Sequence, residues 1–345
     1  MRMVAAGGAW VALMGVVGQA SAQSTADRIQ RRNGSDTGEI TAVTPLVVMI
    51  SKSGVESTVP AEEIRSIRFA GEPTELNTAR TALAAGRYRD AYGAAVAAAK
   101  TNPRRAEVLA EAQFLAAASQ AALALAGQEE LPEAVAAVRG FLAQHRSSYR
   151  IPAAIELYGD LLLRDGQYAA ARDEYAKLAK AKNEYYAAKS HHLVGRAWQA
   201  EGDATKALTE YDQALAGAPP GQLGAPIRLA ATLDRAVSQA AAGDPKQAAA
   251  TIGKIISAAG DEDEQVLARA YNALGDAYQR SGDAQGALFA YLHVDLLFAT
   301  SGDEHARALS QLAKLWKTAG QESRGRDAAD RLAKSYPDSR WAGEK

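Results

Sequence analysis

The chain has no cysteine, little phenylalanine and proline, and almost no net charge. Five phenylalanines and eleven prolines occur in 345 residues, and 39 basic residues nearly balance 40 acidic ones. Without cysteine the chain cannot form a disulfide, a thiolate zinc site, a thiol nucleophile or a lipid-anchored cysteine. A net charge of -1 argues against a general nucleic-acid binder, which normally has a clear basic excess.

Alanine is the residue that the chain has in excess, with 79 copies, close to a quarter of the sequence. Alanine has the best helix propensity and a small side chain, so this composition favours helices packed at close range. A length of 345 residues is sufficient for two or more domains or for one long repeat array.

Residues 1–22 have the anatomy of a secretory signal peptide. Arg2 supplies a positively charged start, residues 4–17 have no charge, and residues 20–22 (Ala-Ser-Ala) form a small-x-small cleavage signal. We therefore predict cleavage before Gln23 and export to the periplasm or cell envelope. The apolar stretch is short for a span of about 20 residues. Charges interrupt the later apolar runs, so no membrane span is expected after cleavage.

The segment after the signal peptide divides into a predicted flexible linker, residues 23–36, and a small β module, residues 37–70. The linker is polar, whereas the module has short β-branched runs separated by Pro45, Gly54 and Pro60, which predicts three or four strands. A lone domain below about 40 residues is rarely stable, so we expect the module to pack against the first helices or against a copy of itself. It resembles a small SH3-like or Sm-like module, and both a capping role and a ligand-binding or assembly role are open.

From residue 72 onward, helical periodicity takes over and the chain repeats itself. Three units align on Gly159, Gly195 and Gly275. Seven residues later each unit has glycine, twelve later alanine and sixteen later tyrosine: Gly166, Gly202 and Gly282; Ala171, Ala207 and Ala287; Tyr175, Tyr211 and Tyr291. The pattern is typical of two antiparallel helices. The first glycine permits close approach, the second ends the first helix, and a following aspartate caps the second. The alanine lies where the helices cross, and the tyrosine is expected to fill the space between neighbouring hairpins.

This pattern resembles the tetratricopeptide repeat (TPR) family, whose signature is W-x-x-L-G-x-x-Y followed by G, A, F or Y, and P. Weaker units fit the same frame at 72–103, 111–145, 229–257 and 309–337. The resemblance covers residues 72–341. It implies a mainly α fold, a TPR-type α-solenoid of about seven helical hairpins preceded by the β module. The units exceed the usual length, and we place the excess in loops such as 217–226 and 260–264. The register of the second and fifth units is open.

The sequence has no P-loop, dinucleotide-binding, nucleophile-elbow or H-E-x-x-H motif. His191 and His192 are adjacent, so on a helix they point about 100° apart and cannot act as i,i+4 metal ligands. We expect His191 to be a half-buried packing residue. The acidic run at 261–264 lacks the pattern of an EF-hand and fits a solvated loop ahead of a helix. We therefore expect no catalytic residues, cofactor or metal site.

In the TPR family, five positions of each unit point into a concave groove. In this chain those positions hold nine Lys or Arg residues against three acids, Glu156, Asp160 and Asp276. The predicted partner-binding groove consists of Arg80, Arg164, Lys189, His192, Arg196, Arg269, Asn272, Arg280, Arg307, Lys314 and Lys317.

The resemblance implies a non-enzymatic protein-interaction scaffold of the periplasm or cell envelope that binds a protein or peptide in its groove. The basic excess favours an acidic partner, because Arg and Lys form charge-assisted hydrogen bonds with carboxylates. Three alternatives are open: an envelope-assembly or cell-division adaptor whose β module and repeats bind different partners, an accessory subunit of an enzyme, and self-assembly through the terminal repeats. Nucleic acid is not expected as a partner, and the oligomeric state is open.

Overall fold

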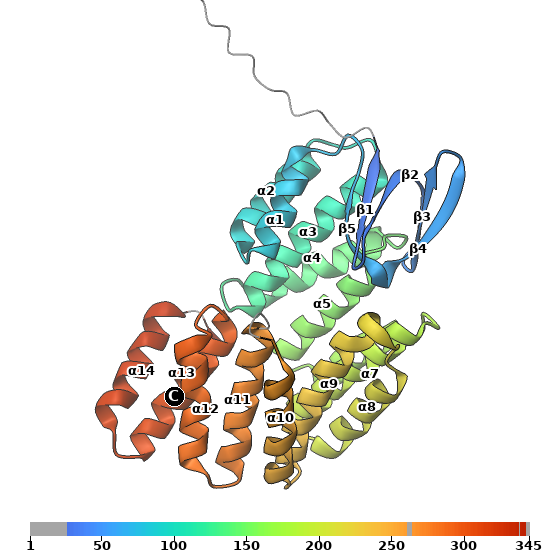
Figure 1. The fold of residues 1–345 in the computed structure, drawn as a ribbon. Helices are drawn as coiled ribbons and strands as arrows, with labels where there is room; N and C mark the ends of the chain where they lie inside the picture. The colour runs from blue at the N-terminus through green and yellow to red at the C-terminus, as the bar shows by residue number, and fades with distance from the viewer. Residues whose placement is uncertain (1–25, 261–263, 338, 343–345) are drawn as a thin grey trace, which may run out of the picture.

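The computed structural model describes residues 26–260, 264–337 and 339–342 and shows a small β sheet followed by stacked helices (Figure 1). The strands are β1 (Asp27–Arg31), β2 (Ser35–Val43), β3 (Val47–Lys52), β4 (Val55–Pro60) and β5 (Ile64–Arg68), with a 3₁₀ turn η1 (Ala61–Glu63) before β5. The helices are α1 (Thr74–Ala84), α2 (Tyr88–Lys100), α3 (Ala106–Leu125), α4 (Leu131–Gln144), α5 (Ile151–Arg164), α6 (Tyr168–Ala179), α7 (Glu184–Glu201), α8 (Ala204–Gly217), α9 (Gly221–Ala241), α10 (Pro245–Ala258), α11 (Glu264–Arg280), α12 (Ala284–Leu297), α13 (Gly302–Thr318) and α14 (Glu322–Ser335), and a second 3₁₀ turn, η2 (Arg340–Ala342), follows. The predicted signal peptide, residues 1–22, and residues 261–263 of the acidic run lie outside the described residues.

The five strands form one antiparallel sheet in the order β4-β3-β2-β1-β5. The chain therefore runs back and forth through the first four strands, and β5 then returns to pair with β1, with Ile29 opposite Ile67. Among the described residues no ladder joins β4 to β5, so both are edge strands. The predicted β module is confirmed as a small sheet, with one strand more than the sequence indicated.

The prediction of a flexible linker over residues 23–36 is wrong from residue 27 onward, because β1 and the start of β2 lie there. Asp27 is buried, and its carboxylate accepts the backbone N–H groups of Ile40 and Ala70, each at 2.7 Å. Ile29 is also fully buried. The strand was missed because a polar residue, Asp27, occupies an inward position where a strand pattern normally shows an apolar one.

The fourteen helices of the described chain form seven hairpins, as predicted. We call the first helix of each hairpin its A helix (α1, α3, α5, α7, α9, α11 and α13) and the second its B helix. The glycines that end three A helices have left-handed backbones, with φ of 76° at Gly166, 94° at Gly202 and 80° at Gly282, which is the conformation that favours glycine at a helix end. The predicted aspartate cap is confirmed at Asp283, which accepts the N–H of Gly286 at 2.8 Å.

The conserved spacing of glycine and tyrosine within a unit reflects one close contact inside each hairpin. A Cβ atom added to Gly159 would lie 2.2 Å from the ring of Tyr175, and the distance at Gly195 is 2.7 Å to the ring of Tyr211. Each glycine therefore leaves the space that the tyrosine of its own B helix fills, and both rings are fully buried. We expected this tyrosine to fill the space between neighbouring hairpins, but its ring packs against the glycine of its own hairpin.

The sheet and the first hairpins share one hydrophobic core. Ile29, Ile67 and Phe69 of the sheet belong to the same buried cluster as Leu76 of α1 and Phe114 of α3. This confirms that the β module packs against the first helices. It explains how so small a sheet is stable, since the helices cover its apolar face.

Two details of the helices differ from expectation. The predicted loop at 217–226 is largely helical, because α9 begins at Gly221 and includes Pro226. Arg228 donates to the carbonyl oxygens of Pro219 and Gly221 at the start of this helix. The second detail is α3, which is long and apolar enough to cross a membrane, although the sequence suggested that no later stretch is. In the structure 67% of its apolar window is buried within the protein, as is usual for a core helix.

Candidate functional site

The residues of the predicted groove lie on the A helices, and most of them pair with a group on a neighbouring helix. The ion pairs between successive A helices are Lys189 with Glu156, Arg196 with Asp160, Arg269 and His192 with Asp234, and Arg307 with Asp276. The three acids that the sequence placed in the same groove, Glu156, Asp160 and Asp276, are thus the partners of three of its cations. Instead of an excess of positive charge, the structure shows these charges paired between successive A helices. We call this set of ion pairs the charge ladder.

Burial strengthens the charge ladder at its centre. Burial alone would raise the pKa of the Asp234 carboxyl, but Arg269 and His192 beside it hold that pKa below its usual range. His192 Nε2 lies 2.8 Å from Asp234 Oδ2, and both side chains are buried. His192 therefore belongs to the interface between α7 and α9. His191 is half-buried, as expected, and pairs with Glu210 on α8 at 2.7 Å.

The tyrosines of the B helices hold the acids of the ladder in place. Tyr175 donates its hydroxyl to Asp160 at 2.7 Å, and Tyr291 donates to Asp276 at 2.6 Å. In the unit between them, Tyr211 donates to Gln199 at 2.8 Å. Each tyrosine therefore has two roles. Its ring packs against the glycine of the A helix, and its hydroxyl orients the Asp or Gln side chain that faces the next unit.

The remaining predicted residues have different surroundings. Asn272 is buried and donates to Glu304 Oε2 at 2.7 Å, and its own Oδ1 has no hydrogen-bond partner in the described part of the chain. Arg164 is half-buried, and its Nε is likewise without a partner there. Arg280 is exposed at the end of α11, and Lys314 and Lys317 are exposed on α13. The structure therefore brings together the central residues of the predicted set and leaves its terminal members open to solvent.

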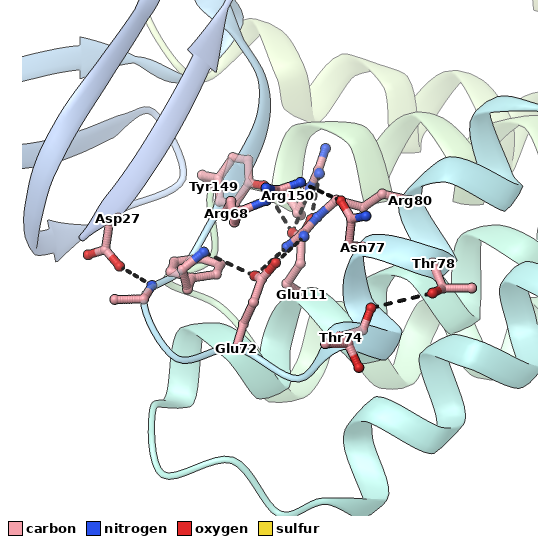
Figure 2. A network of polar contacts seen from close by, with 12 residues as sticks. Asp27, Arg68, Glu72, Thr74, Asn77, Thr78, Arg80, Glu111, Tyr149 and Arg150 are labelled. Carbon is pink, nitrogen blue, oxygen red and sulfur yellow. Dashed lines mark hydrogen bonds and ion pairs between the residues drawn. The ribbon is translucent and has the colours of Figure 1, made fainter. Parts of the chain in front are cut away.

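Sequence reasoning missed the most deeply buried charge cluster, which lies where the sheet meets the first hairpins (Figure 2). Glu111 is fully buried on α3 and accepts hydrogen bonds from Arg150 at 2.7 and 2.9 Å, Arg80 at 3.2 Å and the Tyr149 hydroxyl at 2.9 Å. Burial alone would raise its pKa, but the two guanidinium groups hold the pKa of Glu111 at about 2. Arg80, a predicted groove residue, also forms a two-pronged pair with Glu72. A single acid within the alanine-rich face of α3 was the available signal.

A wide hollow lies at the last hairpin, and we call it the terminal groove. It has a volume of about 530 Å³ and lies between α13, α14 and η2. Its walls are Ser310, Ala313, Lys314 and Lys317 of α13, Glu322, Gly325, Arg326, Ala329, Leu332 and Ala333 of α14, and Trp341 and Ala342 of η2. A smaller hollow of about 170 Å³ lies between the β2–β3 turn and helices α5 to α7. Two predicted groove residues, Lys314 and Lys317, therefore line the terminal groove.

The described residues contain no group of three or more His, Asp or Glu side chains placed to hold a metal ion. The polar clusters in this part of the chain are ion pairs of acids with Arg, Lys or His.

Comparison with known proteins shows which fold this is. A tetratricopeptide repeat protein from Parabacteroides merdae matches with a TM-score of 0.53 at 14% identity, over 76% of this chain and 91% of its own. A Rap protein complexed with competence and sporulation factor matches with a TM-score of 0.56 at 14% identity, over 78% of this chain and 77% of its own. NprR in complex with its cognate peptide NprX matches with a TM-score of 0.50 at 14% identity, over 76% and 77%. No family model and no curated protein matches the sequence. The TPR-type solenoid predicted from the repeats is confirmed.

Proposed function

We propose that this TPR-type protein is an exported, non-enzymatic scaffold that binds a protein or peptide partner on the surface formed by its A helices. The observation on which the proposal rests is the charge ladder, because its inter-helix pairs hold the polar side chains of that surface in place before any partner arrives. Preorganised side chains lose less conformational entropy on binding. Two of the structural neighbours, the Rap protein and NprR, were solved with a peptide or a factor bound, which supports this type of function.

The ladder also indicates which residues test the proposal most cleanly. Reversing the charge of Lys189 or Arg196 would leave Glu156 or Asp160 without its partner, so such a change would perturb the fold as well as the surface. Arg280 is exposed and forms no ion pair with another described residue, so its reversal breaks no ion pair.

The partner is tested by affinity capture from an envelope fraction with wild-type protein and Arg280→Glu. Lys246→Glu, an exposed residue of helix B α10, is the matched control. We expect Arg280→Glu to weaken capture of the partner and Lys246→Glu to leave it unchanged. Equal capture by all three proteins contradicts a site on this part of the A-helix surface.

Export is tested separately, by cell fractionation and sequencing of the mature N-terminus. We expect the protein in the envelope fraction to begin at Gln23, and we expect Ala22→Arg to block this cleavage because the small residue before the cut is lost. Recovery of a chain that begins at Met1 in the cytoplasmic fraction contradicts the export proposal.

The alternative of an adaptor with two partner surfaces has one specific observation in its favour. β4 is an edge strand, and Val55 at its start is 71% exposed. Edge strands offer unpaired backbone groups to which a partner strand can add. If the sheet recruits a second partner in this way, Val55→Lys will remove that partner from the captured set and leave the partner of Arg280 in place.

A further inference from the structure

Three positions of an A helix face the next A helix along the stack. Relative to the aligned small residue of the unit, which is Gly159, Gly195 or Gly275 and in the last unit Ala313, they lie three residues before it and one and four residues after it. The contacts are Glu156 with Lys189 and Asp160 with Arg196 from α5 to α7, His192 with Asp234 and Gln199 with Ser238 from α7 to α9, and Asn272 with Glu304, Asp276 with Arg307 and Gln279 with Gln311 from α11 to α13. The acids at these positions, Glu156, Asp160 and Asp276, each meet a cation of the next A helix.

In the last A helix the same three positions hold Ser310, Lys314 and Lys317. All three line the terminal groove instead of facing another A helix. The A helix α13 packs against both helices of the hairpin before it, α11 and α12. After α14 the described chain has only the short turn η2, which packs against both α13 and α14. The terminal groove is therefore the place that an incoming A helix fills in the interior of the stack.

The shape of the terminal groove suits a helix. Its residues on α14 run from Glu322 to Ala333, which at 1.5 Å per residue is a length of about 16 Å, or three helical turns. Its floor is formed by small residues, among them Ala313 and Ala329, which let a second backbone approach closely. Trp341 of η2 adds an apolar aromatic ring to its lining. Such a surface fits recognition of an amphipathic helix in a groove.

The charge of the terminal groove specifies the chemistry of that helix. Lys314, Lys317 and Arg326 line it against a single acid, Glu322. Lys317 and Arg326 form no ion pair with any other residue of the described chain. We infer that the terminal groove binds an acidic amphipathic helix of a partner protein, placed along α13 and α14 as an interior A helix is placed in its own unit. The inference rests on the proposed scaffold function and names the site and the chemical character of one partner segment.

The inference is tested with the full mature chain and a fluorescein-labelled, 16-residue helical peptide that has alanine and leucine on one face and glutamate beside it. The matched peptide has glutamine in place of each glutamate. We expect the acidic peptide to bind about tenfold more tightly than the glutamine peptide in fluorescence anisotropy, because charge-assisted hydrogen bonds are lost in the latter. We also expect binding to change the tryptophan fluorescence of the protein and Trp341→Phe to remove most of that change.

Two variants test whether the peptide binds in the terminal groove. Ala329→Trp fills the floor at an exposed position and should reduce affinity at least tenfold, and Arg326→Glu should do so by reversing the charge. Lys334→Glu, on the same helix but outside the groove, is the matched control and should leave the affinity nearly unchanged. Equal affinity for the two peptides, equal losses for Arg326→Glu and Lys334→Glu, or undiminished binding by Ala329→Trp overturns the inference.

A second copy of this chain is the competing occupant. A dimer in light scattering of the purified protein that Ala329→Trp converts to a monomer overturns the assignment to a partner helix. Failure of the inference is distinguishable from failure of the proposed function. If the captured partner is lost with Arg280→Glu but retained with Ala329→Trp, the scaffold function stands and the terminal groove is not its site.

Discussion

Replacing Glu111 by glutamine tests whether its buried cluster joins the sheet and the first hairpins energetically. The carboxylate accepts four hydrogen bonds from Arg80, Tyr149 and Arg150, and the side chain is fully buried (Figure 2). In Glu111→Gln the shape is retained, but Arg150 loses the carboxylate that compensates its charge and Arg80 keeps only Glu72. Breaking a buried pair by removing one partner typically costs about 3–5 kcal/mol. We expect a loss of that size at neutral pH.

The pKa of Glu111 gives an independent magnitude and a pH window. Its ordinary value of 4.5 is lowered to about 2 in the folded protein, and a shift of that size corresponds to about 3 kcal/mol. Because the folded pKa is the lower one, this contribution is fully present above the unfolded value and is lost as the pH falls from 4.5 toward 2. In Glu111→Gln that part of the pH dependence should be absent.

Hydrogen exchange followed by mass spectrometry is the suitable assay, because a repeat array can unfold one segment at a time. We expect Glu111→Gln to accelerate exchange across residues 72–150 and in the sheet, and to change the last hairpins little. Glu107→Gln on the same helix is the control, since Glu107 is partly exposed and its ion pair with Arg105 is long at 3.7 Å. Unchanged exchange in residues 72–150 would refute the reasoning, and so would an equal effect of Glu107→Gln.

Three further substitutions follow from the same contacts. Gly159→Ala should lower stability by about 1–3 kcal/mol in thermal unfolding because the new methyl group overlaps a tyrosine ring, whereas Gly253→Ala, with no neighbour within 4 Å of the added Cβ, should not destabilise. Tyr291→Phe should cost about 1 kcal/mol through loss of a buried hydrogen bond, whereas Phe289→Gln on the same helix should be nearly neutral because Phe289 is 55% exposed. Arg105→Ala should accelerate hydrogen exchange in the sheet, since its guanidinium bonds the buried aspartate of β1 at 2.7 Å; unchanged exchange there contradicts this role.

The repeat architecture could be predicted because its signals are local. A glycine that ends a helix, an aspartate that caps the next one and a glycine–tyrosine pair sixteen residues apart all act within one hairpin, so their spacing appears directly in the sequence. The same holds for the β-branched runs of β2 to β5. Strand β1 was missed because its inward position is filled by Asp27, whose carboxylate is satisfied by backbone N–H groups from strand β2 and from the segment after β5.

The candidate site shows where sequence reasoning reached its limit. The residues predicted for the groove lie on the A helices, but the sequence does not show that Lys189 meets Glu156 or that Arg196 meets Asp160. Those pairs depend on how far each hairpin rotates relative to its neighbour. Arg326 of the terminal groove lies on a B helix, outside the positions considered, and it joins Lys314 and Lys317 only through the packing of α14 against α13.

The sequence by itself determined that this chain is a stack of helical hairpins with a small sheet before it, since backbone propensity, capping and periodic burial are encoded within about 40 residues. Which of its charges pair with one another depends on how the hairpins stack. Contacts between residues 30 to 40 positions apart neutralise the middle of the A-helix surface. At the last hairpin, where among the described residues only η2 follows, the same positions hold Lys314 and Lys317, which line the terminal groove. Coulomb energy depends on distances in space, and the stacking of the units sets those distances.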